Sequence, residues 1–229
     1  MQLAEISGVE DFARAARDLA AAPDEIDQLQ LGVDLAVKLI AGCDHASVTL
    51  LRSGRMLTPV SSDDLVRRGD ALQYELAEGP CLDSVQSHET VVSQDLSQEK
   101  RWPRWTDSAL VDMDIRGMMS LWLSCNSRSY GALNLYADRI DAFEPEDYAT
   151  AHALAAQLSV AVAAQREIGE RGVAMESRTL IGQAQGILME RLAIDADQAF
   201  AYLRRISQTE NRKLITICNE IVETRHLPL

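Results

Sequence analysis

The sequence has few cysteines and no long apolar run, and both shortages exclude classes of protein. Its four cysteines, Cys43, Cys81, Cys125 and Cys218, are far apart and form no CxxC pair. This spacing provides no zinc motif or disulfide framework, so we expect buried free thiols in a reducing cytoplasm. No apolar run is long and uncharged enough to span a bilayer. The first twenty residues lack a basic segment before an apolar one, so we expect no secretory signal.

Signature motifs of catalysis are also missing. The sequence contains no GxSxG, P-loop or GxGxxG motif and no cyclic-nucleotide signature. Its four histidines do not have the spacing of metal ligands; they are His45, His88, His152 and His226. We therefore expect a protein that is not an enzyme, with no catalytic residue, no metal and no cofactor.

Positive charge is scarce, and the net charge of the 229 residues is −13. Residues 176–229 hold seven Lys/Arg and seven Asp/Glu, so the whole excess of acid lies in the first 175 residues. An acidic surface repels nucleic acid. Any nucleic acid would therefore bind the C-terminal tail, through a local basic patch rather than through net charge.

Three helical patterns follow one another in this tail. Apolar residues recur at helical spacing over 180–191, 196–206 and 214–222. Asp195 and Asn211 stand at N-cap positions, and Gln198 can complete a capping box with Asp195. Helices this short must pack on one another to offset their ordering entropy. The pattern predicts a small three-helix bundle.

The tail resembles an ANTAR domain, the RNA-binding output module of bacterial transcription antiterminators. The resemblance rests on AQGILMERL (184–192), DADQAFAYLRRIS (195–207) and NRKLITICNEIV (211–222). One residue departs from the family, which commonly carries a lysine where this chain has Gln185. The resemblance implies binding to RNA stem-loops in nascent transcripts.

The candidate RNA-binding residues are polar, cationic or small, and most surround the junction of the second and third tail helices. They are Gln185, Gly186, Arg204, Arg205, Gln208, Asn211, Arg212 and Lys213. Clustered cations can neutralise phosphates, and amide side chains can read unpaired bases. Composition alone favours a solvated polar face instead, and the ANTAR resemblance reverses that preference. Gly182 and Gly186 indicate either close approach by a ligand or packing against a neighbouring helix.

The front of the chain alternates between helical and strand patterns. We expect an N-terminal helix within 1–25, a helix over 24–41, helices over 63–74 and 80–87, and a long helix from Glu144. Strand patterns cover 45–51, 56–62, 91–92, 117–125 and 129–137. The expected fold class is α+β, with an antiparallel sheet flanked by helices.

This front half resembles a GAF domain of the kind fused to ANTAR domains, over roughly residues 26–165. The resemblance is carried by EGPCLDSV (78–85), VVSQDL (91–96), RWPRW (101–105) and YGALNLY (130–136) followed by AFEPED. GAF folds host many ligands and some host none, so the fold names no ligand. The candidate ligand-pocket residues are Cys81, Trp102, Trp105 and Tyr136, with ordinary core packing as the alternative.

Residues 146–175 are expected to connect the GAF domain to an ANTAR domain over 176–229. Steps of three and four place these residues on one seam: Leu154, Leu158, Ala161, Gln165, Ile168, Gly172 and Met175. The seam predicts coiled-coil character and a homodimer. For Leu154 and Leu158 the alternative is a helix that covers its own sheet. Gly169 and Gly172 suggest a flexible point in the connector.

Together these patterns predict a cytoplasmic, homodimeric transcription antiterminator without a membrane segment. In this interpretation the GAF domain receives a small-molecule or protein signal, and the ANTAR domain binds hairpins in nascent RNA. One alternative is a DNA-binding regulator that uses residues 214–222 as a recognition helix. The other is a GAF sensor or scaffold whose tail only mediates protein–protein contacts.

Overall fold

A computed structural model describes residues 13–226 of the chain. The chain divides into two compact units, residues 1–165 and residues 166–229. The first unit is an α+β domain built on one sheet, and the second is helical. The expected fold class is confirmed.

The first unit contains a five-stranded antiparallel sheet with the strand order β2-β1-β5-β4-β3. Its strands are β1 (His45–Arg52), β2 (Arg55–Ser61), β3 (Val91–Ser93), β4 (Gly117–Cys125) and β5 (Arg128–Ala137). Two hairpins, β1–β2 and β4–β5, are joined edge to edge because β1 also pairs with β5. All five strands predicted from the sequence are confirmed to within a residue or two.

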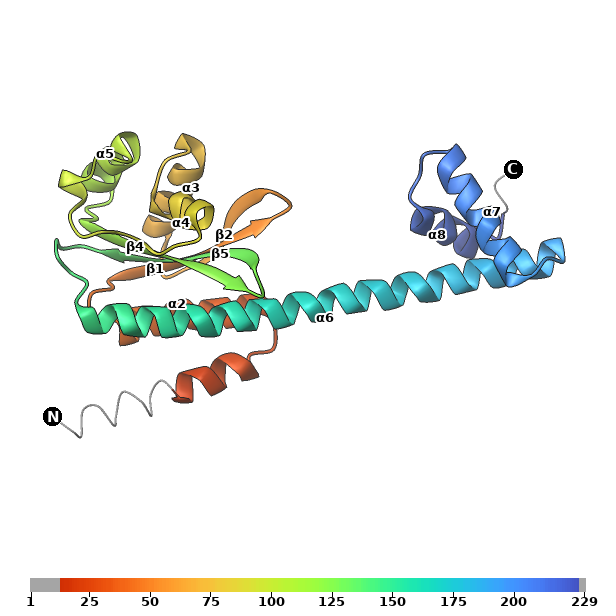
Figure 1. Cartoon of the computed structure of the whole chain (residues 1–229), viewed down its shortest axis with the longest axis horizontal. Helices are drawn as coiled ribbons and strands as arrows, with labels where there is room; N and C mark the ends of the chain where they lie inside the picture. Colours follow the sequence, from red (N-terminus) through yellow and green to blue (C-terminus); the bar gives the residue numbers. More distant parts are fainter. Residues whose placement is uncertain (1–12, 227–229) are drawn as a thin grey trace. The chain divides into compact units, whose positions relative to one another are not determined.

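Helices cover both faces of this sheet (Figure 1). α2 (Glu25–Leu39) and the start of α6 lie against one face, and three helices lie against the other. These three are α3 (Asp64–Leu76), α4 (Pro80–Ser87) and α5 (Pro103–Asp112), with a short 3₁₀ turn at η1 (Leu96–Gln98). Asp24 caps α2 as predicted, because its Oδ1 accepts the Asp27 N–H at 2.9 Å. Residues 13–21 are helical, and the part of the predicted first helix before residue 13 lies outside the described residues.

The two faces of the sheet differ in polarity. Successive side chains of a strand point to opposite faces. Val48, Leu133 and Leu135 therefore enter the apolar core beneath α2 and α6. Their neighbours Thr49 and Asn134 face α3 and α4 and are completely buried. The first unit thus has an apolar core on one side of its sheet and a partly polar interior on the other.

α6 (Pro145–Leu192) is a continuous helix of 48 residues. α6 runs through Gly169 and Gly172 without a break, and the flexible point expected there stays a prediction. Each glycine lowers helix stability by only about 1 kcal/mol, which the flanking helix formers offset. Leu154 and Leu158 are buried in the core of the first unit, so the alternative interpretation holds for them.

The second unit is a small bundle of the end of α6, α7 (Ala196–Thr209) and α8 (Leu214–Thr224). The first predicted tail helix is thus the last part of α6 rather than a separate element. The core of the three-helix bundle contains eight buried residues: Ala184, Leu188, Ala199, Leu203, Ile206, Ile217, Cys218 and Ile221. The predicted three-helix packing is confirmed.

The two predicted N-caps of the bundle have different outcomes. Asp195 and Gln198 form the expected capping box, with Asp195 Oδ1 accepting the Gln198 N–H at 2.8 Å. The prediction for Asn211 is wrong, because α8 begins after an N-cap at Lys213. Asn211 has a φ of 50° and reverses the chain after α7. Asparagine tolerates this left-handed conformation better than most residues, which explains its presence in the turn.

The capping box predicts the effect of Asp195→Ala. Losing the side-chain acceptor should destabilise the start of α7 by about 1 kcal/mol, measured as faster amide hydrogen exchange of α7 peptides in the full-length chain. Asp197→Ala is the matched control, because Asp197 lies in the first turn without capping it. Equal acceleration in both variants would contradict the capping role.

Candidate functional site

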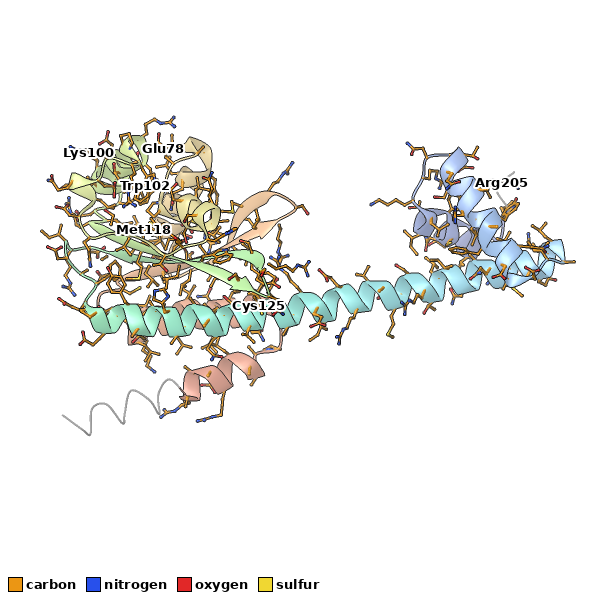
Figure 2. All side chains as sticks on the ribbon, viewed as in Figure 1. Glu78, Lys100, Trp102, Met118, Cys125 and Arg205 are labelled. Atoms are coloured by element: carbon orange, nitrogen blue, oxygen red, sulfur yellow. The ribbon has the colours of Figure 1, made fainter. Side chains whose placement is uncertain are left out.

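The outer face of α7 carries three of the predicted RNA-binding residues. Ala199, Leu203 and Ile206 are buried against the bundle and therefore fix the orientation of the helix. Arg204, Arg205 and Gln208 then point to solvent and are exposed. Figure 2 labels Arg205 on α7.

The ring of Tyr202 supports one of these cations. The guanidinium of Arg205 lies over this half-buried ring, 5.2 Å from its centroid. A cation held over an aromatic face loses less conformational freedom when it binds an anion than a free arginine does. Tyr202 is therefore better placed to hold Arg205 than to stack on a base.

The turn between α7 and α8 exposes three more predicted residues, Asn211, Arg212 and Lys213. Arg212 is held by two carboxylates, with N–O distances of 2.9 Å to Glu210 and 2.5 Å to Glu220. Within residues 13–226, no ion pair joins Arg204, Arg205 or Lys213 to a carboxylate. The available positive charge at this junction therefore comes from those three residues, with Arg212 neutralised.

The other two predicted residues lie on α6 and behave differently. Gln185 is half-buried, and its Nε2 donates to the Ala196 carbonyl at 3.0 Å, so it ties the end of α6 to the start of α7. Gly182 and Gly186 are exposed, and a Cβ at either position would meet no atom within 4 Å. Packing against a neighbouring helix of this chain does not explain these glycines.

The four predicted pocket residues of the first unit are all buried. Cys81, Trp102, Trp105 and Tyr136 are at most 2 % exposed and belong to one cluster beneath α3, α4 and α5. Figure 2 labels Trp102 within this part of the fold. The indole N–H of Trp105 donates to the Gly69 carbonyl at 3.0 Å. The indole N–H of Trp102 donates to Asp83 Oδ2 at 2.9 Å. A ligand could reach these side chains only if the helices above them moved.

A buried polar cluster, which the sequence reasoning missed, lies beside them. At its centre is Asp70 on α3, which is 0 % exposed. Four neutral groups donate hydrogen bonds to its carboxylate: Ser47 Oγ at 2.6 Å, Thr58 Oγ1 at 2.9 Å, Asn134 Nδ2 at 3.0 Å and the Tyr136 hydroxyl. The sequence contained a pattern that could have indicated this burial, because Asp70 lies at helical spacing from Val66 and Gln73, on the buried face of α3.

Burial controls the protonation of this cluster. Desolvation raises the pKa of Asp70 to about 6, although its hydrogen bonds oppose the change. Within residues 13–226, no cationic side chain forms a hydrogen bond or an ion pair with Asp70. Burial, with the nearby Asp70 charge, also raises the pKa of the Cys81 thiol to about 12. Cys81 is therefore a protonated hydrogen-bond donor to Thr49 Oγ1, at 3.2 Å, and not a nucleophile.

Within residues 13–226, no three His, Cys, Asp or Glu side chains gather closely enough to hold a metal ion. No helix in that range combines the length and apolar character needed to cross a membrane.

The chain thus combines an α+β unit that has a closed polar interior with a helical unit that exposes, among its described residues, several unpaired cations. The GAF domain family model matches residues 22–163, and the chain belongs to this family. The ANTAR domain model matches residues 172–222. Both are regulatory rather than catalytic domains, so the expected GAF–ANTAR organisation is confirmed.

Solved structures support the fold of the first unit. The GAF domain of a phosphoenolpyruvate-protein phosphotransferase from Coxiella burnetii has a TM-score of 0.56 at 16 % identity, covering 72 % of this chain and 98 % of its own. Its Acinetobacter counterpart has a TM-score of 0.55 at 17 % identity with the same coverage. The free methionine-R-sulfoxide reductase of Neisseria meningitidis, solved with its substrate, has a TM-score of 0.52 at 15 % identity, covering 69 % of this chain and 89 % of its own. At such identities the likeness shows the fold alone. No curated protein matches the chain.

The raised pKa of Asp70 predicts a pH-dependent stability. The folded state holds this proton up to about pH 6, whereas the unfolded chain releases it near the ordinary value of 3.8. The stability that protonated Asp70 contributes is therefore complete below pH 3.8 and is lost as the pH rises through 6. The stability difference between wild type and Asp70→Asn should change by roughly 2 to 3 kcal/mol between pH 4 and pH 7.

Urea unfolding followed by tryptophan fluorescence measures this change, because Trp102, Trp105 and Trp122 all lie in the first unit. Asp64→Asn is the control, since Asp64 lies on the same helix and its side chain is fully exposed. A pH-independent difference for Asp70→Asn would contradict a shifted carboxyl at this position.

Proposed function

We propose that this protein is a signal-responsive, RNA-binding transcription antiterminator of the cytoplasm. Its GAF domain receives a signal, and its ANTAR domain binds hairpins in nascent RNA and prevents the terminator from forming. The observation that carries the proposal is the exposed surface formed by Arg204, Arg205 and Gln208 on α7 together with Lys213 just before α8, which we call the α7 face. This function requires binding but no catalytic group.

The charge distribution supports RNA binding by the tail rather than by the whole surface. The chain nets −13, and the tail nets zero. Long-range attraction of RNA is therefore weak, and affinity depends on local contacts to phosphates and unpaired bases. Gln208 and Asn211 stand beside the cations, where their amides can read base edges.

The rival DNA-binding interpretation meets an unfavourable surface. A recognition helix inserts its exposed side chains into the major groove. Glu220 and Glu223 are exposed on α8, and Asn219 Nδ2 donates to Glu223 Oε1 at 2.7 Å. An acidic face of this kind repels the phosphates on both sides of the groove.

The signal received by the GAF domain is a small molecule or a protein. The buried polar cluster supports the interior of the domain as a ligand-binding site, because its hydrogen-bond donors and acceptors already converge around the Asp70 carboxylate. The proposed pocket residues stay Cys81, Trp102, Trp105 and Tyr136. Because all four are buried, a ligand can enter only if α3, α4 or α5 moves.

Homodimerisation through the connecting helix belongs to the same proposal. Ile168 and Met175 lie two turns apart on one face of α6, with exposed fractions of 62 % and 71 %. Large apolar side chains this exposed are typical of a helix that packs on a partner. The seam that starts at Leu154 is therefore available for packing on a partner helix only beyond the core of the first unit.

The RNA proposal predicts a specific salt dependence. The full-length protein should retain a hairpin RNA in filter binding and retain duplex DNA far less. The double variant Arg205→Ala/Lys213→Ala should weaken RNA binding and reduce the slope of log K against log salt by about 1.4, from two phosphate contacts of about 0.7 each. Arg212→Ala is the matched control with a smaller effect, because Arg212 is already paired with Glu210 and Glu220. An unchanged slope in the double variant would remove the α7 face from the interface.

The dimer proposal predicts a change in mass. Ile168→Asp with Met175→Asp should halve the mass measured by light scattering, because two buried charges in a helical seam are strongly unfavourable. Val173→Asp is the control, since Val173 is 64 % exposed on a different face of the same helix. A monomeric wild type at micromolar concentration would rule out this dimer.

A further inference from the structure

A groove of about 500 Å³ lies between the end of α6 and the end of α8. Its lining residues are Gln183, Gly186, Ile187, Glu190 and Arg191 from α6, and Val222 and Arg225 from α8. Two arginines far apart in the sequence thus meet at one cavity, which no pattern in the sequence indicates. We name this cavity the α6–α8 groove.

Gly186 in this groove has no role that the fold explains. A Cβ there would meet no atom within 4 Å, and the backbone is ordinary helix. Glycine within a helix is unfavourable relative to alanine, and at Gly186 the open position lies inside the groove, where a close contact from a ligand would explain it. That contact must come close to the helix backbone.

The charges of the groove indicate an anionic ligand. Arg191 and Arg225 are exposed, and no ion pair joins either one to another residue of the described 13–226. Arginine presents a fork of N–H donors that matches the oxygens of a phosphate. Glu190 also lines the groove and opposes an anion, so the net charge of the lining side chains is +1.

The positions of both arginines are explained by the helix ends, but the helix ends do not use all of the guanidinium N–H donors. Arg191 lies in the last turn of α6, and Arg225 is the C-cap of α8. Cations are favoured at helix C-termini. A guanidinium has five donors, so one that interacts with a helix end keeps donors for a ligand.

We propose that the α6–α8 groove binds a phosphodiester of the RNA backbone. Arg191 and Arg225 pair with the phosphate, and the missing side chain at Gly186 lets the strand approach the helix. This inference rests on the proposed RNA-binding function and adds a second contact region, formed by residues other than those of the α7 face.

The test measures hairpin RNA binding by the full-length protein against salt. Arg191→Gln with Arg225→Gln should weaken binding about tenfold or more and lower the salt slope by about 1.4. Arg178→Gln is the charge control, because Arg178 is an exposed cation on α6 outside the groove. Glu190→Gln should tighten binding, since it removes the opposing carboxylate. Unchanged or weaker binding by Glu190→Gln counts against the groove.

A second variant separates binding from folding. Gly186→Leu should raise the helical stability of the chain, because leucine is a better helix former and has open space. It should at the same time weaken RNA binding by filling the groove. Gly169→Leu is the control, since this glycine is equally open and lies outside the groove. A stabilised Gly186→Leu variant with full affinity overturns the inference.

The outcomes distinguish this inference from the proposed function. If the wild type binds no RNA, the proposed function fails and the groove contact fails with it. If RNA binding depends on the α7 face but not on the groove variants, only the groove inference fails. A calorimetric titration with a nucleoside monophosphate covers the other source of phosphate. In one outcome the wild type binds the nucleotide and the double variant Arg191→Gln/Arg225→Gln does not, while both proteins bind RNA equally well. That result would assign the groove to a free nucleotide and overturn the RNA contact.

Discussion

A carboxylate buried without a cation is the constraint on which the interior of the GAF domain depends. Asp70 cannot keep its charge away from water unless other groups replace the lost hydration. Residues from β1, β2 and β5 supply four donors, so three strands are tied to α3 through one side chain. This requirement explains why Ser47 and Asn134 occupy buried strand positions that would otherwise be apolar.

The same constraint links the polar cluster to its neighbours on α3 and α4. Tyr74 Oη lies 2.6 Å from Thr49 Oγ1 and 2.8 Å from Thr58 Oγ1, and Gln73 Oε1 accepts the Cys81 N–H at 2.9 Å. A fully satisfied network favours one arrangement of these helices, because any displacement leaves buried groups unpaired. A ligand that supplied equivalent hydrogen bonds would remove that penalty. A GAF domain with a closed interior can therefore still respond to a signal.

In the ANTAR domain the constraint is hydrophobic rather than electrostatic. The small core leaves one face of each helix exposed, and the sequence places different charges on these faces. α7 exposes Arg204 and Arg205, whereas α8 exposes Glu220 and Glu223. Burial of Leu203 and Ile221 thus decides which side chains of α7 and α8 are presented to solvent.

The sequence predicted most of the fold, because periodicity and capping are local properties. The five strands, the α4 bounds and the Asp195 capping box follow from residues close in the chain. The failures concern properties that are not local. Asn211 could serve as an N-cap or as a left-handed turn residue, and only the packing of α7 on α8 selects the turn. Asp70 stands in a polar segment, and its burial follows from strands that lie earlier and later in the sequence. Arg191 and Arg225 meet only because the ends of two helices do.

The glycines show how far a structural explanation extends. Gly79 has a φ of 144°, and a Cβ there would lie 2.1 Å from Gln73 Oε1, so the fold itself requires glycine. At Gly131 a Cβ would lie 1.8 Å from the Thr49 carbonyl oxygen, with the same consequence. Gly182 and Gly186 have ordinary helical backbone and open space, and alanine at either position would be more stable by about 1 kcal/mol. Gly169 and Gly172 are equally open on the same helix, so open space alone does not distinguish Gly186, whereas its place in the α6–α8 groove does.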